Sequence, residues 1–475
     1  MEKPTIILAT SNGVGMGHLV RATAIATALK EYANPIIVSM ASGIAEIPDY
    51  LGIRCEYIPG RDRMWMSRDK WDIYLRDRLL ALVDETGARV ISFDGVVPYP
   101  GVIAAKFSHP KLSLVWVRRG LWQKKPQRFV LGLQSKMMDL IVEPGDFARA
   151  YDFGPTASRK DATLTSAVSL FQREQAFSRE AARKVLGLDL DRPAVLVQLG
   201  TGDSDVNEKM TAALEGLLGW KDLQVILTKE PLDKAGKSLA PDGLDIRIKR
   251  YFPLAHVLHA FDASVCATGY NGAHELLPAR IPTVFVSNIR GTDDQEARAQ
   301  WCHDMGFALR ADQADLANIR ATVKKLQDAD TREQLYKKCA ELPEPTGGTE
   351  IAKILFDLSM ADEVLRPSFI KYHQLRIQGH INRGIRHLAY KALRRLALTY
   401  RYLHPHLLAQ HVVLDLPIWG SQTTAEELHP LIKGERRFEH LISGASPDYR
   451  AKREAIAGRA YVNMLKVINT KKERL

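Results

Sequence analysis

The stretch from Ala267 to Gln295 holds residues whose types and spacing suit the binding of a sugar nucleotide. Gly269 lets the backbone approach a ligand without a Cβ in the way. A helix that begins just after it offers free N–H groups and the positive end of its dipole to a phosphate. Glu275 lies about one turn into that helix, where its carboxylate can accept hydrogen bonds from two ribose hydroxyls. Asp294 and Gln295 supply acceptors and a donor for further sugar hydroxyls.

These residues need a strand, a glycine turn, a helix and a second strand to position them. An apolar run over residues 263–267 ends at the glycine turn, and Pro282 breaks the chain before the next apolar run, residues 283–286. This order is typical of the βαβ unit of a parallel sheet. Tyr270 and Asn271, at the start of the helix, belong to the same predicted pocket.

The N-terminal segment combines a predicted strand, residues 5–9, with a glycine-rich turn that ends at His18 and an amphipathic helix that follows. A dinucleotide-binding fold begins in the same way, but here His18 stands where its third glycine belongs. The second strand, residues 36–40, also lacks the acidic residue that binds an adenosine ribose. A P-loop is excluded because no Gly-Lys-Ser/Thr sequence is present.

In this order and spacing, Gly269, Glu275 and the Asp294–Gln295 pair resemble the donor-side signature of glycosyltransferases with the two-domain B-type fold. The nearest likeness is to the enzyme that adds N-acetylglucosamine to the lipid-linked peptidoglycan precursor, and to plant and macrolide glycosyltransferases. It covers roughly residues 1–358. The resemblance implies an α/β protein with two Rossmann-like, doubly wound domains facing a central cleft. These are an acceptor-binding domain, 1–160, and a donor-binding domain, 161–358, followed by a basic, mainly helical extension, 359–475.

The resemblance also assigns residues to the two substrates. A glycine-rich turn after a second-domain strand faces the donor across the cleft, and the loop around Phe252 receives the uridine base. The predicted donor-binding residues are Gly200, Thr201, Gly202, Phe252, Gly269, Tyr270, Asn271, Glu275, Asp294 and Gln295. On the acceptor side, Gly15 and Gly17 belong to the loop at the interdomain cleft. Arg118 and Arg119 follow a strand and would contact an anionic acceptor such as a lipid diphosphate, although a solvated loop explains them equally well.

His18 and Asp94 are the predicted catalytic residues. In several members of the resembling family a histidine at this place is the general base that deprotonates the acceptor hydroxyl, and the near-neutral pKa of imidazole suits this task. The alternative is a histidine that caps the helix, or contacts the donor phosphate or the acceptor, without moving a proton. Asp94, at the carboxyl end of a predicted strand, is the rival base, the partner that orients His18, or a cap for the following turn.

The resemblance predicts an inverting, metal-independent glycosyltransferase. It would move a hexose or N-acetylhexosamine from a UDP-sugar to a hydroxyl acceptor such as a lipid-linked or cell-envelope glycan. Asp203-Ser-Asp205 has the D-x-D spelling of metal-dependent enzymes, but it lies at a helix start, where carboxylates cap. We therefore expect no metal and no cofactor, the UDP-sugar being a co-substrate. Two alternatives stay open: a UDP-N-acetylglucosamine 2-epimerase, and a protein that binds nucleotide sugars without turnover.

The composition is that of an ordinary globular protein, with 475 residues of which 46% are hydrophobic and 25% charged. The sequence shows no signal-peptide pattern, and no window approaches about 18 uninterrupted apolar residues. The four cysteines are widely spaced and suggest neither a metal site nor a disulfide framework. We expect a cytoplasmic protein with reduced thiols, with a peripheral position on the inner face of the cell membrane as a further expectation.

The C-terminal quarter carries almost all of the net charge of +11, because residues 361–475 contain 20 Lys and Arg against 10 Asp and Glu. Apolar residues recur there at helical spacing, at positions 377, 381, 385, 388, 392 and 396, with arginines beside them. A basic amphipathic helix can bind an anionic membrane surface. The alternative is an ordinary helix that packs on the donor domain. Nucleic acid is not expected, because no recognised binding module is present.

Overall fold

The computed structural model describes residues 3–11, 16–41, 44, 47, 49–60, 68–109, 111–124, 135, 137–200, 204–229, 238–289 and 292–361. Three of the predicted site residues, Gly15, Thr201 and Gly202, lie outside these ranges. The predicted C-terminal membrane helix also lies outside them. Among the described helices, none has the length and apolar character needed to span a membrane.

Within the described residues, seven parallel strands form the first sheet, in the order β3-β2-β1-β4-β5-β6-β7. The strands are β1 (Thr5–Thr10), β2 (Asn34–Ser39), β3 (Arg54–Tyr57), β4 (Val90–Asp94), β5 (Ser113–Val117), β6 (Leu140–Glu143) and β7 (Thr163–Leu164). The accompanying helices are α1 (Gly17–Leu29), α2 (Arg68–Thr86), α3 (Pro100–Ser108) and the short 3-10 helices η2 (Asp49–Leu51) and η3 (Phe147–Tyr151). The central strands are buried along almost their whole length, because helices cover both faces of a parallel sheet.

The second sheet has six parallel strands among the described residues, in the order β10-β9-β8-β11-β12-β13. They are β8 (Ala194–Gln198), β9 (Gln224–Leu227), β10 (Asp245–Ile248), β11 (Ala263–Ala267), β12 (Thr283–Val286) and β13 (Leu309–Ala311). The helices are α5 (Arg179–Leu186), α6 (Ser204–Leu217), η4 (Leu254–Ala260), α7 (Tyr270–Leu276), α8 (Gln295–Asp304), α9 (Leu316–Lys324), η5 (Lys325–Gln327), α10 (Ala329–Cys339) and α11 (Gly347–Met360). The predicted βαβ unit is thus β11-α7-β12.

Both sheets are doubly wound, and each has one point where the strand order reverses. In the first sheet this point lies between β1 and β4, and in the second between β8 and β11. Ligands of open parallel sheets bind beyond the carboxyl ends of the strands at such points. His18, Asp94, Gly200 and Gly269 lie at or just beyond these four strand ends. Other described site residues follow neighbouring strands: Arg118 and Arg119 follow β5, Phe252 follows β10, and Asp294 and Gln295 follow β12.

Local sequence signals account for several element boundaries. Ser178 accepts a hydrogen bond from the Ala181 N–H as the N-cap of α5, and Gly187 ends that helix with a positive φ of 70°. The segment from Leu254 to Ala260 is a 3-10 helix.

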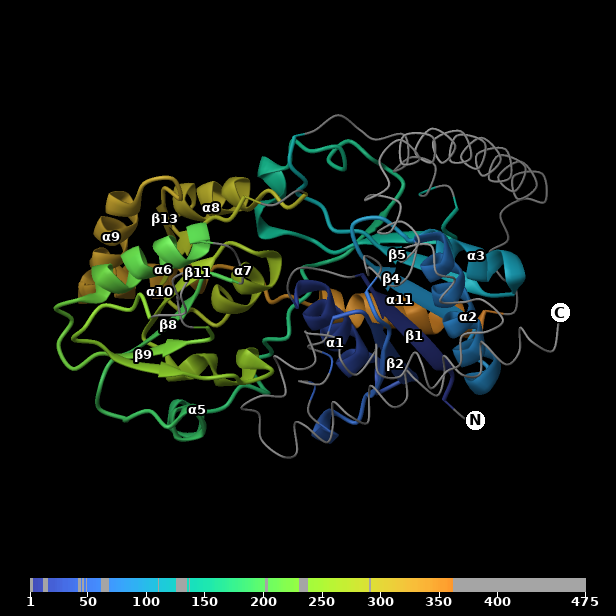
Figure 1. The fold of residues 1–475 in the computed structure, drawn as a ribbon, viewed down its shortest axis with the longest axis horizontal. Helices are drawn as coiled ribbons and strands as arrows, with labels where there is room; N and C mark the ends of the chain where they lie inside the picture. The colour runs from blue at the N-terminus through green and yellow to red at the C-terminus, as the bar shows by residue number, and fades with distance from the viewer. Residues whose placement is uncertain are drawn as a thin grey trace, which may run out of the picture.

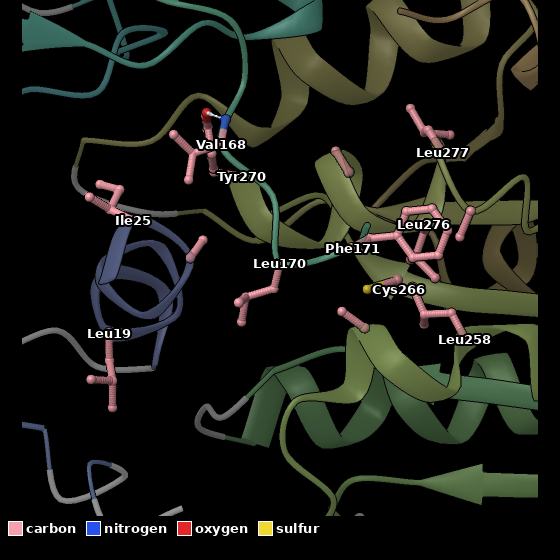
Figure 2. Packing of buried hydrophobic residues seen from close by; sticks show 14 of the residues in the cluster. Leu19, Ile25, Val168, Leu170, Phe171, Leu258, Cys266, Tyr270, Leu276 and Leu277 are labelled. Carbon is pink, nitrogen blue, oxygen red and sulfur yellow. Dashed lines mark hydrogen bonds between the residues drawn. The ribbon is translucent and has the colours of Figure 1, made fainter. Parts of the chain in front are cut away.

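Helix α11 returns from the second half of the chain to pack on α1 and on strands of the first sheet (Figure 1). The linker around Val168–Phe171 and buried residues from both sheets belong to one continuous hydrophobic core (Figure 2). We call the parts built on the two sheets the first and second domains. The boundary at residue 160 stays a prediction; β7, just beyond it, still pairs with β6 of the first sheet.

Candidate active site

His18 and Asp94 form a hydrogen-bonded pair at the reversal point of the first sheet. His18 is the second residue of α1, Asp94 is the last residue of β4, and the His18 Nδ1–Asp94 Oδ1 distance is 2.6 Å. The carboxylate is almost fully buried, whereas 16% of the His18 side chain remains exposed. The sequence predicted both residues, and the structure brings them together.

The charges around the pair indicate which histidine nitrogen carries the proton. Burial by itself would raise the pKa of Asp94, but Arg21 and His18 outweigh it, and the pKa lies below its usual value. The carboxylate is therefore ionised and can only accept, so the Nδ1–H of His18 donates to it. Burial lowers the pKa of His18, which keeps the ring neutral near pH 7. This tautomer leaves the Nε2 lone pair free to take a proton.

Arg21 is a site residue that the sequence analysis missed. It lies three residues after His18 on α1, is 2% exposed, and donates to both oxygens of Asp94 at 2.9 and 2.5 Å. The spacing was the available signal, because residues i and i+3 share one face of a helix.

The starts of α1 and α7 meet across the domain interface. The side-chain amide of Asn271 donates to the backbone oxygen of Gly17 at 3.0 Å. Gly269 is the N-cap of α7, and a Cβ built there would lie 3.9 Å from Gln295 Nε2. The predicted diphosphate position at Gly269 is therefore close to the first turn of α1, which carries His18.

Glu275 lies on α7 and has an unpaired carboxylate oxygen. Its Oε1 is buried and finds no hydrogen-bond partner among the described residues. Burial raises the pKa of Glu275 to about 8. A buried acceptor without a partner costs free energy, so its retention fits a group that receives ligand hydroxyls.

Asp294 and Gln295 start helix α8 and line a cavity of about 340 Å³. Asp294 caps the helix by accepting from the Ala297 N–H at 3.0 Å, and the Gln295 Oε1 accepts from the Asn288 N–H at 3.0 Å. Gln123 of the first domain also lines this cavity. Both predicted sugar-binding residues thus have structural contacts and also face a cavity between the domains.

Three other predicted donor-binding residues, Gly200, Phe252 and Tyr270, lie on three separate segments of the chain. Gly200 follows β8 with φ +89°, a conformation that favours glycine, and Phe252 lies half-buried in the loop before η4. Tyr270 is buried, and its hydroxyl donates to the Gly145 oxygen at 2.7 Å while accepting from the Val168 N–H at 2.9 Å. Its polar group is therefore already paired with first-domain and linker backbone, which gives it a domain-joining role in this structure (Figure 2).

The two predicted acceptor arginines point to different surroundings. Arg118 is fully buried and pairs with Glu143 at 3.2 Å and Asp161 at 2.9 Å, so its contacts are internal to the first domain. Arg119 faces the domain interface, where its Nη1 lies 3.6 Å from Asp293 and its buried Nε has no partner among the described residues. Two Arg118 nitrogens, Nε and Nη1, also lack partners among the described residues, so the difference between the two arginines is that Arg119 faces Asp293 of the second domain.

A buried charge cluster next to this site joins the two domains and was not predicted. Arg298 on α8 donates to Asp146 at 2.8 Å, to Asp293 at 3.0 Å and to the backbone oxygen of Thr268 at 2.7 Å. Segment 121–123 also hydrogen-bonds to residues 292–294, with the Asp294 N–H donating to the Leu121 oxygen at 3.0 Å.

No group of His, Cys, Asp and Glu side chains in the described part of the chain has the arrangement of a metal site. Asp205, half of the D-x-D sequence, pairs with Lys209 at 2.9 Å in the first turns of α6. Asp203 lies outside the described residues.

Comparison with known proteins fits this geometry. The UDP-N-acetylglucosamine--N-acetylmuramyl-(pentapeptide) pyrophosphoryl-undecaprenol N-acetylglucosamine transferase of Rhodococcus jostii is 23% identical over 394 residues, covering 75% of this chain and 97% of the relative. The crystal structure of the glycotransferase of kitacinnamycin has a TM-score of 0.51 at 17% identity, covering 77% of this chain and 100% of the other. A putative UDP-N-acetylglucosamine 2-epimerase from Listeria monocytogenes has a TM-score of 0.52 at 13% identity, covering 77% and 99%. No protein-family model matches the chain.

The solved structures, at these low identities, show the fold: two parallel-sheet, Rossmann-like domains in the glycosyltransferase B arrangement. The predicted fold class is confirmed for the two domains. The sequence relatives confirm the predicted resemblance, and the chain is similar to the N-acetylglucosamine transferases of the peptidoglycan precursor. The prediction of an enzyme of the glycosyltransferase class is confirmed with it.

Proposed function

We propose that this protein transfers a hexose or N-acetylhexosamine from a UDP-sugar to a hydroxyl acceptor, with inversion and without a metal ion. The observation that carries the proposal is the His18–Asp94 pair, which lies beside the start of α7 and its unpaired Glu275. A base and a nucleotide pocket on opposite domains are what a direct displacement at the anomeric carbon requires.

In this mechanism the acceptor hydroxyl loses its proton to His18 Nε2 as its oxygen attacks the anomeric carbon. The bond from that carbon to the diphosphate oxygen breaks, and UDP leaves with the electron pair. Asp94 stabilises the imidazolium that forms. The start of α7 and the guanidinium of Arg119 stabilise charge on the departing diphosphate.

The pocket residues have roles in the same proposal. Glu275 accepts from the ribose hydroxyls, Phe252 and its loop receive the base, and Asp294 and Gln295 bind the donor sugar in the cavity at the start of α8. The name of the Rhodococcus jostii relative supports N-acetylglucosamine as donor sugar and a lipid-linked, cell-envelope acceptor. Such an acceptor would place the protein at the inner face of the cell membrane.

The test is a titration of UDP and a panel of UDP-sugars in a buffer with EDTA, followed by UDP release in the presence of lipid-linked acceptors. Wild-type protein should bind UDP saturably, and at pH 8.5 and above, where Glu275 is mostly ionised, Glu275→Ala should weaken binding by about 1.5–3 kcal/mol through loss of a charge-assisted hydrogen bond. His18→Ala should bind UDP normally and lose turnover. Absence of UDP binding by the wild type would overturn the proposal. Conversion of UDP-N-acetylglucosamine without any acceptor would favour the epimerase alternative instead.

A further inference from the structure

Arg21 is a buried charged group to which the proposed mechanism gives no role. Its Nε donates to Asp94 Oδ2 at 2.9 Å, and its Nη2 donates to Asp94 Oδ1 at 2.5 Å. Such two-point contacts fix the plane of a carboxylate as well as its charge. Asp94 Oδ1 is also the atom that accepts from His18, so Arg21 determines where that acceptor lies.

Arg21 also lies against the catalytic ring itself. Its Nη2 is 2.9 Å from His18 Nδ1, the nitrogen that already donates to Asp94. Both groups are then donors, so their closeness is not a hydrogen bond but places a fixed positive charge beside the imidazole. That charge favours the neutral ring over the imidazolium, while the Asp94 carboxylate that Arg21 holds in place accepts from Nδ1–H and so leaves the lone pair on Nε2.

Arg21 also contacts the second domain. The guanidinium lies 5.0 Å from the ring centroid of Tyr270, the first residue of α7. The Tyr270 hydroxyl accepts from the Val168 N–H, as Figure 2 shows, and donates to the Gly145 oxygen. The next residue, Asn271, donates to the Gly17 oxygen. The aromatic face stabilises the cation only when α7 lies against α1.

We propose that Arg21 is a positioning residue that holds the His18–Asp94 pair in its base-competent tautomer, and that its contact with Tyr270 ties this state to the seating of α7 on α1. The inference rests on the proposed role of His18 as base. It makes proton acceptance by the first domain dependent on the domain that binds the donor.

The expected direction of a pH effect follows from the charges that face each group. Asp94, Arg21 and Arg119 face His18, while Asp94, Tyr270 and Asp293 face Arg21. Burial lowers the pKa of His18 most, Asp94 raises it, and the two arginines lower it further. Removing Arg21 takes away a lowering charge and leaves Asp94 less neutralised. Both changes make the His18–Asp94 pair keep a proton to higher pH.

The experiment is a titration of the whole chain labelled with 15N-histidine, read by NMR without donor or acceptor, with His18 assigned by comparison with His18→Asn. In the wild type at pH 7.5, His18 should be neutral with its proton on Nδ1. In Arg21→Gln its titration midpoint should rise by about one pH unit or more. Arg21→Lys, which keeps the charge, should restore most of the wild-type midpoint. Tyr270→Leu should move the midpoint in the same direction as Arg21→Gln, by less.

Arg183→Gln is the matched control, because Arg183 is also fully buried and pairs with Asp262 at 2.8 Å in the second domain. It should lower the melting temperature and leave the His18 titration unchanged. An unchanged midpoint in Arg21→Gln, or an equal shift in Arg183→Gln, would overturn the inference. If Arg21→Gln does not fold, Arg21→Lys and Tyr270→Leu are measured in its place. A His18 titration midpoint in Tyr270→Leu equal to that of the wild type would exclude the link to α7. Since no ligand is present, failure of UDP binding would refute the proposed function without changing this result.

Discussion

Arg298 and Asp146 form a bidentate ion pair across the domain interface, with Arg298 Nη2 and Nε at 2.8 and 3.0 Å from Asp146 Oδ2. Both side chains are almost fully buried. Burial alone would raise the pKa of Asp146, but Arg298 and His274 outweigh the effect of burial and lower the pKa to about 2. One guanidinium therefore neutralises carboxylates from both domains, because Arg298 also binds Asp293.

Arg298→Met should destabilise the protein strongly, by about 3–5 kcal/mol, because it leaves the buried Asp146 without its arginine and Asp293 with Arg119 at 3.6 Å as its remaining cation. Asp146→Asn should cost less, since Arg298 keeps Asp293 as its partner. Asp146→Asn should also remove the pH dependence that Asp146 gives to the free energy of unfolding. Because the pKa of Asp146 is depressed in the folded protein, its carboxylate stabilises the fold above the ordinary pKa of 3.8, and this stabilisation is lost as pH falls toward 2. Urea unfolding between pH 3 and 7 measures both effects.

The control for this pair is Arg320→Met, which removes an exposed ion pair between Arg320 and Glu215. Exposed pairs contribute about 0–1 kcal/mol, so this variant should be close to wild type. An Arg298→Met protein no less stable than Arg320→Met would show that the cluster does not hold the interface.

Much of the fold was predictable because central strands such as β1, β8, β11 and β12 are short, largely apolar runs that end near a glycine or polar turn. Edge strands such as β3 (Arg54–Tyr57) and β13 (Leu309–Ala311) contain charged residues and carry no such signal. His18 and Asp94 were predictable one by one, from a glycine turn that ends in histidine and from a carboxylate at a strand end. Their pairing was not, because they are 76 residues apart and meet only when β1 and β4 become neighbours.

The rest of the site depends on contacts for which a single sequence carries no local signal. Asp146 and Arg298 are 152 residues apart and come from different domains. Arg118 and Arg119 are adjacent and chemically alike, yet one is inside the first domain and the other faces the cleft. Strand register and the position of Glu143 decide which of the two neighbouring arginines is buried. Neither can be read from the composition or from the order of motifs.

Glu275→Gln should stabilise the protein, and the gain should depend on pH. Because burial raises the pKa of Glu275 from 4.5 to about 8, the folded wild type holds a proton there that the unfolded chain releases above pH 4.5. The wild type therefore loses stability relative to the variant as pH rises from about 4.5 to 8, and the difference levels off above that range. Melting temperatures of both proteins at pH 4, 6, 7 and 8.5 test this, with the smallest difference expected at pH 4. A pH-independent difference would mean that Glu275 titrates normally.

His18→Asn and Asp94→Asn should each lower kcat by about 10²–10⁴-fold while leaving UDP affinity near wild type, because a general base acts in the transition state. The double variant should be no slower than the worse single variant, since residues that act as a unit are not additive. Steady-state UDP release gives kcat, and calorimetry gives UDP affinity. A multiplicative loss in the double variant would mean that Asp94 acts independently of His18.

Asp294 offers a way to separate sugar recognition from helix capping. One of its carboxylate oxygens caps α8, and the side chain lines the cavity at the start of that helix. Asparagine caps as well as aspartate, so Asp294→Asn should keep the melting temperature, whereas Asp294→Ala should cost about 0.5–2 kcal/mol. If the carboxylate binds the donor sugar, both variants should weaken binding of the intact UDP-sugar by about 1.5–3 kcal/mol and leave UDP binding unchanged.

Asp315→Ala is the matched control, because Asp315 caps α9 on the exposed surface. It should lower stability as Asp294→Ala does while binding both ligands like the wild type. Equal loss of UDP and UDP-sugar affinity in Asp294→Asn would place Asp294 outside the sugar subsite.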